Sequence, residues 1–519
     1  MSATPAGDTG ARRAGAAALL LICAGQFMLV LDISIVNVAL PTIQRRLGMS
    51  QAELQWIVTG YTLTFGGFLL LGGRMADVFG RRRMFMLGLA LFASASLVGG
   101  LAQSGVMLIL SRGVQGLGGA MVSPAALSLL TTTFHEGPER NRAIGIWGAV
   151  AASGGAVGVL MGGILTELVT WRWVFLVNVP VAAVVIALAP RVLAEGRGES
   201  KHRPDLPGAA TVTAGLVALV FGLSQGGEHS FSDPRAWVAL LAAAVLLAVF
   251  VAIEQRVSNP LLPFRIFRVS TVVGADLGML LLAASMFGMV FFLTLYLQRI
   301  LRLSPIQTGL AWLPMTAFIA TSAQLATRFV GRIGVKPLFA GGLLLSSGGM
   351  ALLSGVSAGG SYAANALPGL VLVSIGMGLA FTTATVAATA GISDGEQGLA
   401  SGLLVTSQQV GASIGLAVLT AIAAAQTRAS VGPPAVALVD GFQLAFRVAI
   451  GFGIAGAVAV VALVHDDACL AELRRRKLRA LMHRQIAQPV SGQTSPCWPA
   501  VADLHQGRAT VPAEAVVDA

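Results

Sequence analysis

Apolar blocks of about 20 residues recur along this sequence, separated by short polar or basic turns. A helix needs about 20 apolar residues to cross the hydrocarbon core of a bilayer, whereas a transmembrane barrel would need alternating strands, which are absent. Only 11% of the residues are charged, against roughly 25% in soluble chains. We therefore expect an all-α polytopic membrane protein with fourteen spanning helices, at 15–40, 53–72, 84–103, 106–130, 141–166, 173–193, 208–226, 236–254, 271–297, 306–329, 337–356, 367–391, 398–426 and 442–464.

The basic residues predict how these helices are oriented. With the N-terminus inside, the inner loops and tails hold 25 of the 34 Lys and Arg residues and the outer loops hold seven, as the positive-inside rule requires. We expect a multi-pass protein of the cytoplasmic membrane with both termini cytoplasmic. Because the basic residues lie in short loops between apolar blocks, the net charge of +11 does not indicate nucleic-acid binding.

An internal repeat divides the chain into two halves. GGRMADVFGRRRMF (72–85) follows the second block, and ATRFVGRIGVKPLF (326–339) follows the tenth. At an offset of 254 residues Gly80 matches Gly334, whereas Asp77 matches Gly331. Paired halves around a central site are a recurrent transporter design.

The repeat and the loops together predict the organisation of the chain. We expect a cytoplasmic N-terminus at 1–14, a first six-helix half at 15–193, a cytoplasmic linker at 194–207, two inserted helices at 208–254, a second six-helix half at 269–464, and a basic, partly disordered cytoplasmic tail at 465–519.

Three ionisable residues fall well inside the predicted spans: Asp32, Arg112 and Asp276. A charge at the centre of a spanning helix costs about 2.5–3.5 kcal/mol on insertion scales, so such residues usually face a partner or a water-filled cavity. At 1.5 Å per residue, Asp32 and Arg112 lie about 12–13 Å below the same outer surface, and they would pair if their helices face each other. We interpret Asp32 and Asp276 as proton- or substrate-coupling residues. The alternatives are a static Asp32–Arg112 pair that fixes packing and an interfacial Asp276 above an ordinary packing face.

Candidate cavity-lining residues accompany Asp276. Met279, Met286 and Phe287 share its helical face, and such side chains suit an adaptable apolar cavity. Met28 is a fourth candidate.

A glycine seam marks the fifth block, with Gly154, Gly158 and Gly162 at four-residue spacing and Gly163 beside them. Small residues at this spacing allow close helix contact. In a transporter the seam would also let two halves slide or bend, and close packing alone is the alternative.

The loop 72–83 is a candidate gate and contains Gly73, Asp77, Gly80, Arg81 and Arg82. Asp77 would stabilise a nearby helix N-terminus, and the arginines would bind anionic headgroups. A basic inner loop is also a common feature of membrane proteins. Phosphate-binding loops and closely spaced His/Cys ligand sets are absent from the sequence, so we expect no enzyme activity, no cofactor and no metal.

These stretches together resemble the major facilitator superfamily. GGRMADVFGRRR resembles its loop 2–3 signature, and LILSRGVQGLGGA (108–120) resembles its helix 4 signature. LDISIVNVALP (31–41), WRWVFLVNVP (171–180) and YLQRILRLSPIQTGLAWLP (296–314) are similar to its fourteen-helix drug:proton antiporter branch. The resemblance covers roughly residues 15–465.

The resemblance implies proton-driven export by alternating access through a central cavity between the halves. It implies coupling or cation recognition for Asp32, proton coupling for Arg112, and gating against the second half for Asp77. One signature departs from the family: G-P-x-x-G-G of helix 5 reads GVLMGG here, with Val159 in place of proline, so the bend that proline would supply has no basis in the sequence.

The sequence thus predicts a drug:proton antiporter that expels amphiphilic drugs or antibiotics, embedded in membrane lipids and acting as a monomer. A dedicated exporter of one self-made antibiotic or metabolite is the alternative. A non-transporting membrane ligand sensor is an alternative of another class, which the intact Asp32, Arg112 and loop 72–83 disfavour.

Overall fold

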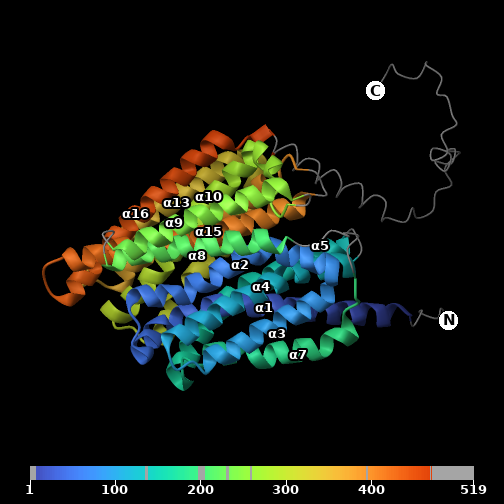
Figure 1. Ribbon diagram of the computed structural model, residues 1–519, viewed down its shortest axis with the longest axis horizontal. Coiled ribbons are helices and arrows are strands. Elements are labelled where there is room, and N and C mark those ends of the chain that lie inside the picture. The colour runs from blue at the N-terminus through green and yellow to red at the C-terminus, as the bar shows by residue number, and fades with distance from the viewer. Residues whose placement is uncertain are drawn as a thin grey trace, which may run out of the picture. The chain divides into compact units, whose positions relative to one another are not determined.

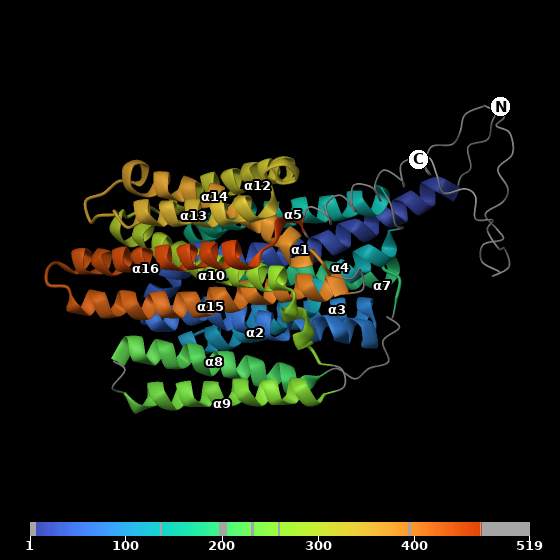
Figure 2. The same ribbon diagram turned by 90° about the horizontal axis from the view of Figure 1, so that it is seen from above.

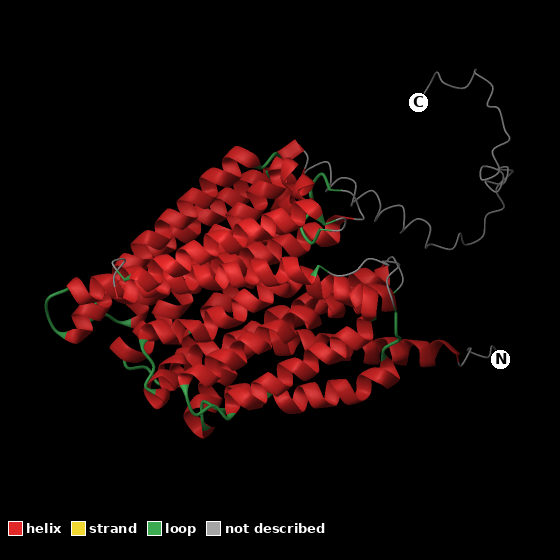
Figure 3. Cartoon of the chain, in the orientation of Figure 1, coloured by secondary structure: helices red, strands yellow, loops and turns green. Residues whose placement is uncertain are grey.

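The computed structural model describes residues 7–134, 138–196, 205–229, 233–257, 260–392, 396–467 and 469. Within these ranges the regular structure is helical and no strand occurs (Figure 3). Thirteen of the described helices are long and apolar enough to cross a membrane. Together with the pair α11–α12 they correspond to the fourteen blocks expected from the sequence. Most of the predicted linker and tail lies outside the described residues.

The helices fall into three groups along the chain. The first group contains α1 (Gly7–Leu47), α2 (Gln51–Phe79), α3 (Arg81–Gly100), α4 (Gly105–Thr133), α5 (Pro138–Ile164), the π-helical turn η1 (Leu165–Val169), α6 (Trp173–Leu176) and α7 (Asn178–Val192). The second is the hairpin α8 (Leu206–His229) and α9 (Pro234–Arg256). The third contains η2 (Phe264–Arg268), α10 (Ser270–Leu295), η3 (Tyr296–Ile300), α11 (Pro305–Ala311), α12 (Leu313–Ile333), α13 (Val335–Leu353), η4 (Tyr362–Ala366), α14 (Leu367–Thr389), α15 (Gln397–Ala429) and α16 (Pro434–Leu463).

Helix α1 is longer than the sequence suggested. We expected it to end near Pro41, but it continues through this residue to Leu47. A proline inside a helix removes one backbone hydrogen bond and does not oblige the chain to stop. The following helix, α2, begins with a capping box, in which Ser50 accepts from the Glu53 backbone N–H and the Glu53 side chain accepts from the Ser50 backbone N–H.

The hairpin of α8 and α9 packs along the seam between the two larger groups (Figures 1 and 2). Helix α8 contacts both α2 and α15, and α9 packs on α8. A small apolar cluster joins the three elements through Leu63 of α2, Val220 of α8 and Ala417 of α15. The Gln55 amide donates to the Ser224 hydroxyl at 2.9 Å. The hairpin is thus tied to both groups.

The internal repeat has a structural counterpart in two helix junctions. At the α2–α3 junction Gly80 has a φ of 106°, and the Glu195 carboxylate accepts a hydrogen bond from the backbone N–H of Arg82, two residues later. At the α12–α13 junction Gly334 has a φ of 98°, and Asp466 accepts from the Lys336 N–H at 2.8 Å. Positive φ favours glycine, so each glycine ends one helix and the distant acid starts the next.

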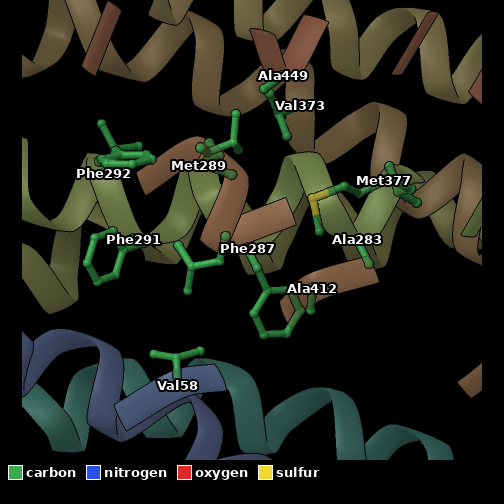
Figure 4. Packing of buried hydrophobic residues seen from close by; sticks show 14 of the residues in the cluster. Val58, Ala283, Phe287, Met289, Phe291, Phe292, Val373, Met377, Ala412 and Ala449 are labelled. Atoms are coloured by element: carbon green, nitrogen blue, oxygen red, sulfur yellow. The ribbon is translucent and has the colours of Figure 1, made fainter. Parts of the chain in front are cut away.

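The largest cluster of buried apolar side chains includes many residues of α10. Figure 4 shows Phe292 and Met289 pointing to one side of α10, and Phe287 and Phe291 pointing to the other, toward Val58 of α2. Helix α10 therefore supplies apolar contacts both within its own group and toward the first group.

Candidate functional site

A cavity of about 550 Å³ lies between helices of the two larger groups. Its walls come from α1, α5, α10 and α12. The lining is mostly apolar and consists of Val30, Ile33, Ser34, Asn37, Val38, Ser153, Gly155, Ala156, Val159, Met286, Phe287, Val290, Trp312, Met315, Thr316, Ala317, Ile319, Ala320 and Ala323. This size and composition are typical of a site for a small organic molecule.

The predicted lining residues divide into two pairs. Met286 and Phe287 line the cavity. Met28 and Met279 do not belong to its lining, and both are 2% exposed in the packed core. The rotation of each helix about its axis decides this difference. Helix α1 turns Val30, Ile33 and Asn37 toward the cavity, and Met28 is buried in the packed core instead. One sequence cannot fix this rotation.

The two groups touch closely at the end of the cavity where α11 begins. The Gln298 amide donates to the Val38 carbonyl at 2.8 Å, and the Ile306 N–H donates to the Glu167 carboxylate at 2.9 Å. Arg299 also donates to the Gln44 side chain. Each bond joins the first group to the third, so this end of the cavity is held closed.

Asp32 lies in a polar network inside the first group. It is fully buried, and its Oδ2 pairs with Arg112 Nη1 at 2.5 Å. Its Oδ1 accepts from Asn178 at 2.9 Å and from Gln115 at 3.2 Å. Ser96 accepts from both of these amides. The network joins α1, α3, α4 and α7, and the carboxylate has a donor on each oxygen.

Arg112 is held by more than the carboxylate. Its Nε donates to the Ile57 carbonyl at 2.9 Å, and its Nη1 donates to Gln115 at 2.9 Å. The guanidinium also lies 4.5 Å from the centre of the Tyr61 ring, within cation–π range. These contacts satisfy a buried charge that would otherwise be very costly.

Asp32 and the cavity lie on opposite faces of α1. The cavity-facing residues Ile33, Ser34 and Asn37 follow one stripe of the helix, and Asp32 points away from that stripe into the first group. The carboxylate therefore does not line the cavity in this structure, although it lies one residue away from residues that do.

Asp276 is a buried acid of the third group. It is 6% exposed, on α10, and does not line the cavity. The Ser407 hydroxyl on α15 is close enough to act on this carboxyl group, but neither of its oxygens has a hydrogen bond of good geometry in the described part of the chain. Asp276 therefore differs sharply from the well-paired Asp32.

The glycine seam of α5 meets two different partners. Cβ atoms built on Gly158 and Gly162 would lie 2.9 Å from the Leu31 carbonyl oxygen and 2.6 Å from the Ile35 carbonyl oxygen, both on α1. A Cβ on Gly154 would also meet α1. On Gly163 it would lie 2.5 Å from the Pro305 carbonyl oxygen of α11. The seam therefore packs α5 within its own group and, at Gly163, against the other group.

The predicted loop 72–83 is helical except at Gly80, because α2 continues to Phe79 and α3 begins at Arg81. We keep the name loop 72–83 for this helix junction, which packs against the end of α7. Asp77 pairs with Arg81 of the same loop at 3.4 Å, and its side chain is 42% exposed. Arg82 pairs with Glu195 at 3.4 Å and donates to the Leu193 carbonyl at 3.0 Å. Gly80 supplies the turn, and Gly73 lies close to Pro124 of α4.

Sequence reasoning missed several residues of these sites. Gln115, Asn178 and Ser96 were not singled out, although Gln115 follows Arg112 by one helical turn and a buried amide needs partners. Glu167 and Glu195 were also missed because each lies at a helix end, where an acid is unremarkable. Among the described residues, no group of three or more His, Cys, Asp or Glu side chains could hold a metal ion.

Two groups of apolar helices around a central cavity that is closed at one end, with a buried acid on a helix that lines this cavity in each group, define a membrane transporter. The sequence matches the pattern of the Major Facilitator Superfamily over residues 22–416. The chain belongs to this family.

Relatives and solved structures agree with that assignment. The chain is 41% identical to the puromycin resistance protein of Streptomyces alboniger, covering 86% of this chain and 91% of the relative. It is 41% identical to the cephamycin export protein of Amycolatopsis lactamdurans, covering 82% and 89%. A bacterial homologue of the human lysosomal transporter Spinster, in an inward-facing and unoccupied conformation, has the same fold, with a TM-score of 0.62, 18% identity and coverage of 89% and 98%.

Proposed function

We propose that the protein is an exporter that expels drug-like molecules across the cytoplasmic membrane in exchange for protons, with no enzymatic step. Relatives named for antibiotic resistance or export support the export direction. The observation that carries the proposal is the double role of α1, which lines the cavity with Asn37 and holds Asp32 on its opposite face.

In this proposal the state of Asp32 changes the position of α1. A proton on Asp32 would remove the charge that Arg112 pairs with, and Arg112 would retain Gln115, the Ile57 carbonyl and the Tyr61 ring. The tie between α1 and α4 would then weaken. Because α1 is also a wall of the cavity, movement of this helix would alter the cavity for substrate.

We assign the second proton site to Asp276. A buried carboxyl group without a well-aligned hydrogen-bond donor is costly as an ion, and neither oxygen of Asp276 has such a donor among the described residues. It can exchange a proton without breaking an ion pair, in contrast to Asp32. Asp77 and the arginines of loop 72–83 are assigned to gating at the opposite end from α11.

The orientation is part of the proposal. We place both termini and loop 72–83 in the cytoplasm, because the inner loops then carry most of the basic residues. The closed end at α11 is then the outer end, so the structure corresponds to a state closed to the outside. A cysteine introduced in loop 72–83 should react with an impermeant maleimide in everted vesicles and not in intact cells. We also propose a monomer.

Everted vesicles test the exchange directly. Substrate uptake should begin when a proton gradient is imposed and stop when an uncoupler collapses it. Asp32→Asn and Asp276→Asn should each abolish gradient-driven uptake. Asp233→Asn is the matched control, because Asp233 caps α9 away from the cavity and asparagine also serves as a helix cap. Uptake that persists with the uncoupler, or with both variants at the wild-type rate, would refute proton coupling.

A dedicated exporter of one compound is the second candidate. It is favoured by the names of relatives, which include resistance or export proteins for puromycin, cephamycin, lincomycin and tetracenomycin C. A 36% identical relative from Mycobacterium tuberculosis is instead a multidrug resistance protein. Expression in a sensitive host, tested against a panel of unrelated antibiotics, separates the two: resistance to one compound favours the dedicated exporter.

A further inference from the structure

The polar side chains of the cavity direct their donors away from it. Among the described lining residues, Ser34, Asn37, Ser153 and Thr316 are the polar side chains with hydrogen-bonding groups, apart from Trp312, and none is charged. The three hydroxyls donate to carbonyls of their own helices, at 3.1, 2.8 and 2.9 Å. The Asn37 amide donates to the Ile33 carbonyl at 2.8 Å. The oxygens that remain toward the cavity are acceptors.

The donors that the wall can offer are few. They are the indole N–H of Trp312 and the second amide hydrogen of Asn37. The rest of the wall is apolar and adaptable, with Met286, Phe287 and Met315 among its larger side chains. Aromatic and thioether groups make favourable contacts with aromatic rings.

The acids near the cavity do not supply a charge to it. The negative charge of Asp32 is balanced by Arg112 and enclosed by Gln115 and Asn178 on the far face of α1. Asp276 does not line the cavity. A cation bound here would lose its hydration without gaining an ion pair, and that desolvation is costly.

We propose that the cavity binds an uncharged aromatic molecule whose hydroxyl or N–H groups donate hydrogen bonds to acceptors on its wall. This deepens the proposed function by naming a substrate class, and it rests on that function for transport alone. Asp32 then has no part in recognising substrate charge, contrary to the cation-recognition role that the family resemblance implied.

Binding to the purified full-length protein in nanodiscs tests the substrate class. N-phenyl-1-naphthylamine is an uncharged aromatic N–H donor, and tetraphenylphosphonium is a permanent aromatic cation. After subtraction of binding to empty nanodiscs, the amine should bind at least about tenfold more tightly, which corresponds to about 1.4 kcal/mol. The N-methylated amine, which lacks the donor, should bind more weakly than its parent. Equal binding of amine and cation would overturn the proposal.

Two charge-changing variants and one control test whether the cavity wall or Asp32 decides the preference between amine and cation. Asn37→Asp puts a carboxylate on the cavity wall and should reverse the preference toward the cation. Asn365→Asp, in η4 outside the cavity lining, is the isosteric control and should leave the preference unchanged. Asp32→Asn should keep the preference for the amine over the cation at about tenfold or more, even if loosening of α1 changes the affinity for both ligands. Loss of cation binding in Asp32→Asn, from an initially strong level, would assign the cation site to Asp32 and refute us.

A second acid variant serves if Asn37→Asp does not fold. Ser153→Asp places the same charge on α5, at an exposed position of the cavity wall, and should shift the preference in the same direction. Binding and transport are read separately. Selective binding of the amine without gradient-driven uptake would refute the proposed proton exchange and leave the proposed substrate class standing. Proton-driven uptake together with selective binding of the cation would refute the substrate class and leave the exchange standing.

Discussion

A methyl group added to Gly163 or Gly309 should open the outer end of the cavity. The two glycines lie where α5 crosses α11. A Cβ on Gly163 would lie 2.5 Å from the Pro305 carbonyl oxygen, and one on Gly309 would lie 2.6 Å from the Val159 carbonyl oxygen. Backbone atoms cannot move aside as a flexible side chain can, so α5 and α11 must separate.

The contact between α5 and α11 sets the size of the change in the population open at the α11 end. Overpacking by one methyl group costs typically about 1–3 kcal/mol, and here the cost is paid only while the two groups are in contact. A differential of about 1–3 kcal/mol changes an equilibrium by roughly 5–150-fold. Gly163→Ala and Gly309→Ala should therefore increase the population open at the α11 end by a factor in this range.

Cysteine labelling measures that population. Thr316→Cys places a thiol on the cavity wall; Cys23 and Cys469 are buried, and Cys497 is replaced by serine. Impermeant maleimide added outside intact cells should label this thiol faster in both alanine variants. Gly158→Ala is the matched control, because its Cβ would clash at 2.7 Å with Ser34 Cβ inside the first group. Equal acceleration by all three variants, or by none, would refute the reasoning.

Four further outcomes are expected. Gly158→Ala should lower the temperature of thermal unfolding in detergent, because overpacking by a methyl group costs about 1–3 kcal/mol. Gly155→Ala should leave this temperature almost unchanged, because its Cβ would have its nearest neighbour at 3.9 Å. Asn178→Leu removes a donor from the buried α1 carboxylate and should destabilise the fold by about 1–3 kcal/mol; an unchanged unfolding temperature would contradict this. Glu167→Gln replaces a charged acceptor by a neutral one at the α11 contact, so the labelling assay should show a smaller acceleration than with Gly163→Ala. Burial and a nearby carboxylate raise the pKa of the Cys469 thiol to about 12. The contribution of this thiol to the free energy of unfolding is complete below the thiol pKa of the unfolded chain and is lost as pH rises toward 12. Alkylation of Cys469 at mildly alkaline pH should therefore be slow until the protein is denatured.

The contact between Asp32 and Arg112 shows how far depth counting reaches. Helical rise placed the two residues at one level, and the structure joins them at 2.5 Å. The same reasoning gave no information on Asn178 or Gln115, because a polar residue in an apolar block has many positions it can face. Helix rotation and neighbours decide which side chains meet, and these depend on packing across the whole fold.

The cavity illustrates the same limit for larger side chains. Met286 and Phe287 line it, but Met28 and Met279 are buried in the core. The four residues were chosen for their chemical character, which suits a core as well as a cavity. Only the placement of α1 and α10 against α5 and α12 distinguishes these two environments.

The amino-acid sequence by itself determined the membrane-spanning helices, the repeat and the family, because each depends on local hydrophobicity or on residues close together in the chain. Tertiary structure decided three other features: the length of α1 beyond Pro41, the position of the hairpin α8–α9 along the seam, and the close contact at Gly163. It also decided the separation of Asp32 from the cavity. These features arise from contacts between helices far apart in sequence, where fit between surfaces, rather than composition, sets the lowest free energy.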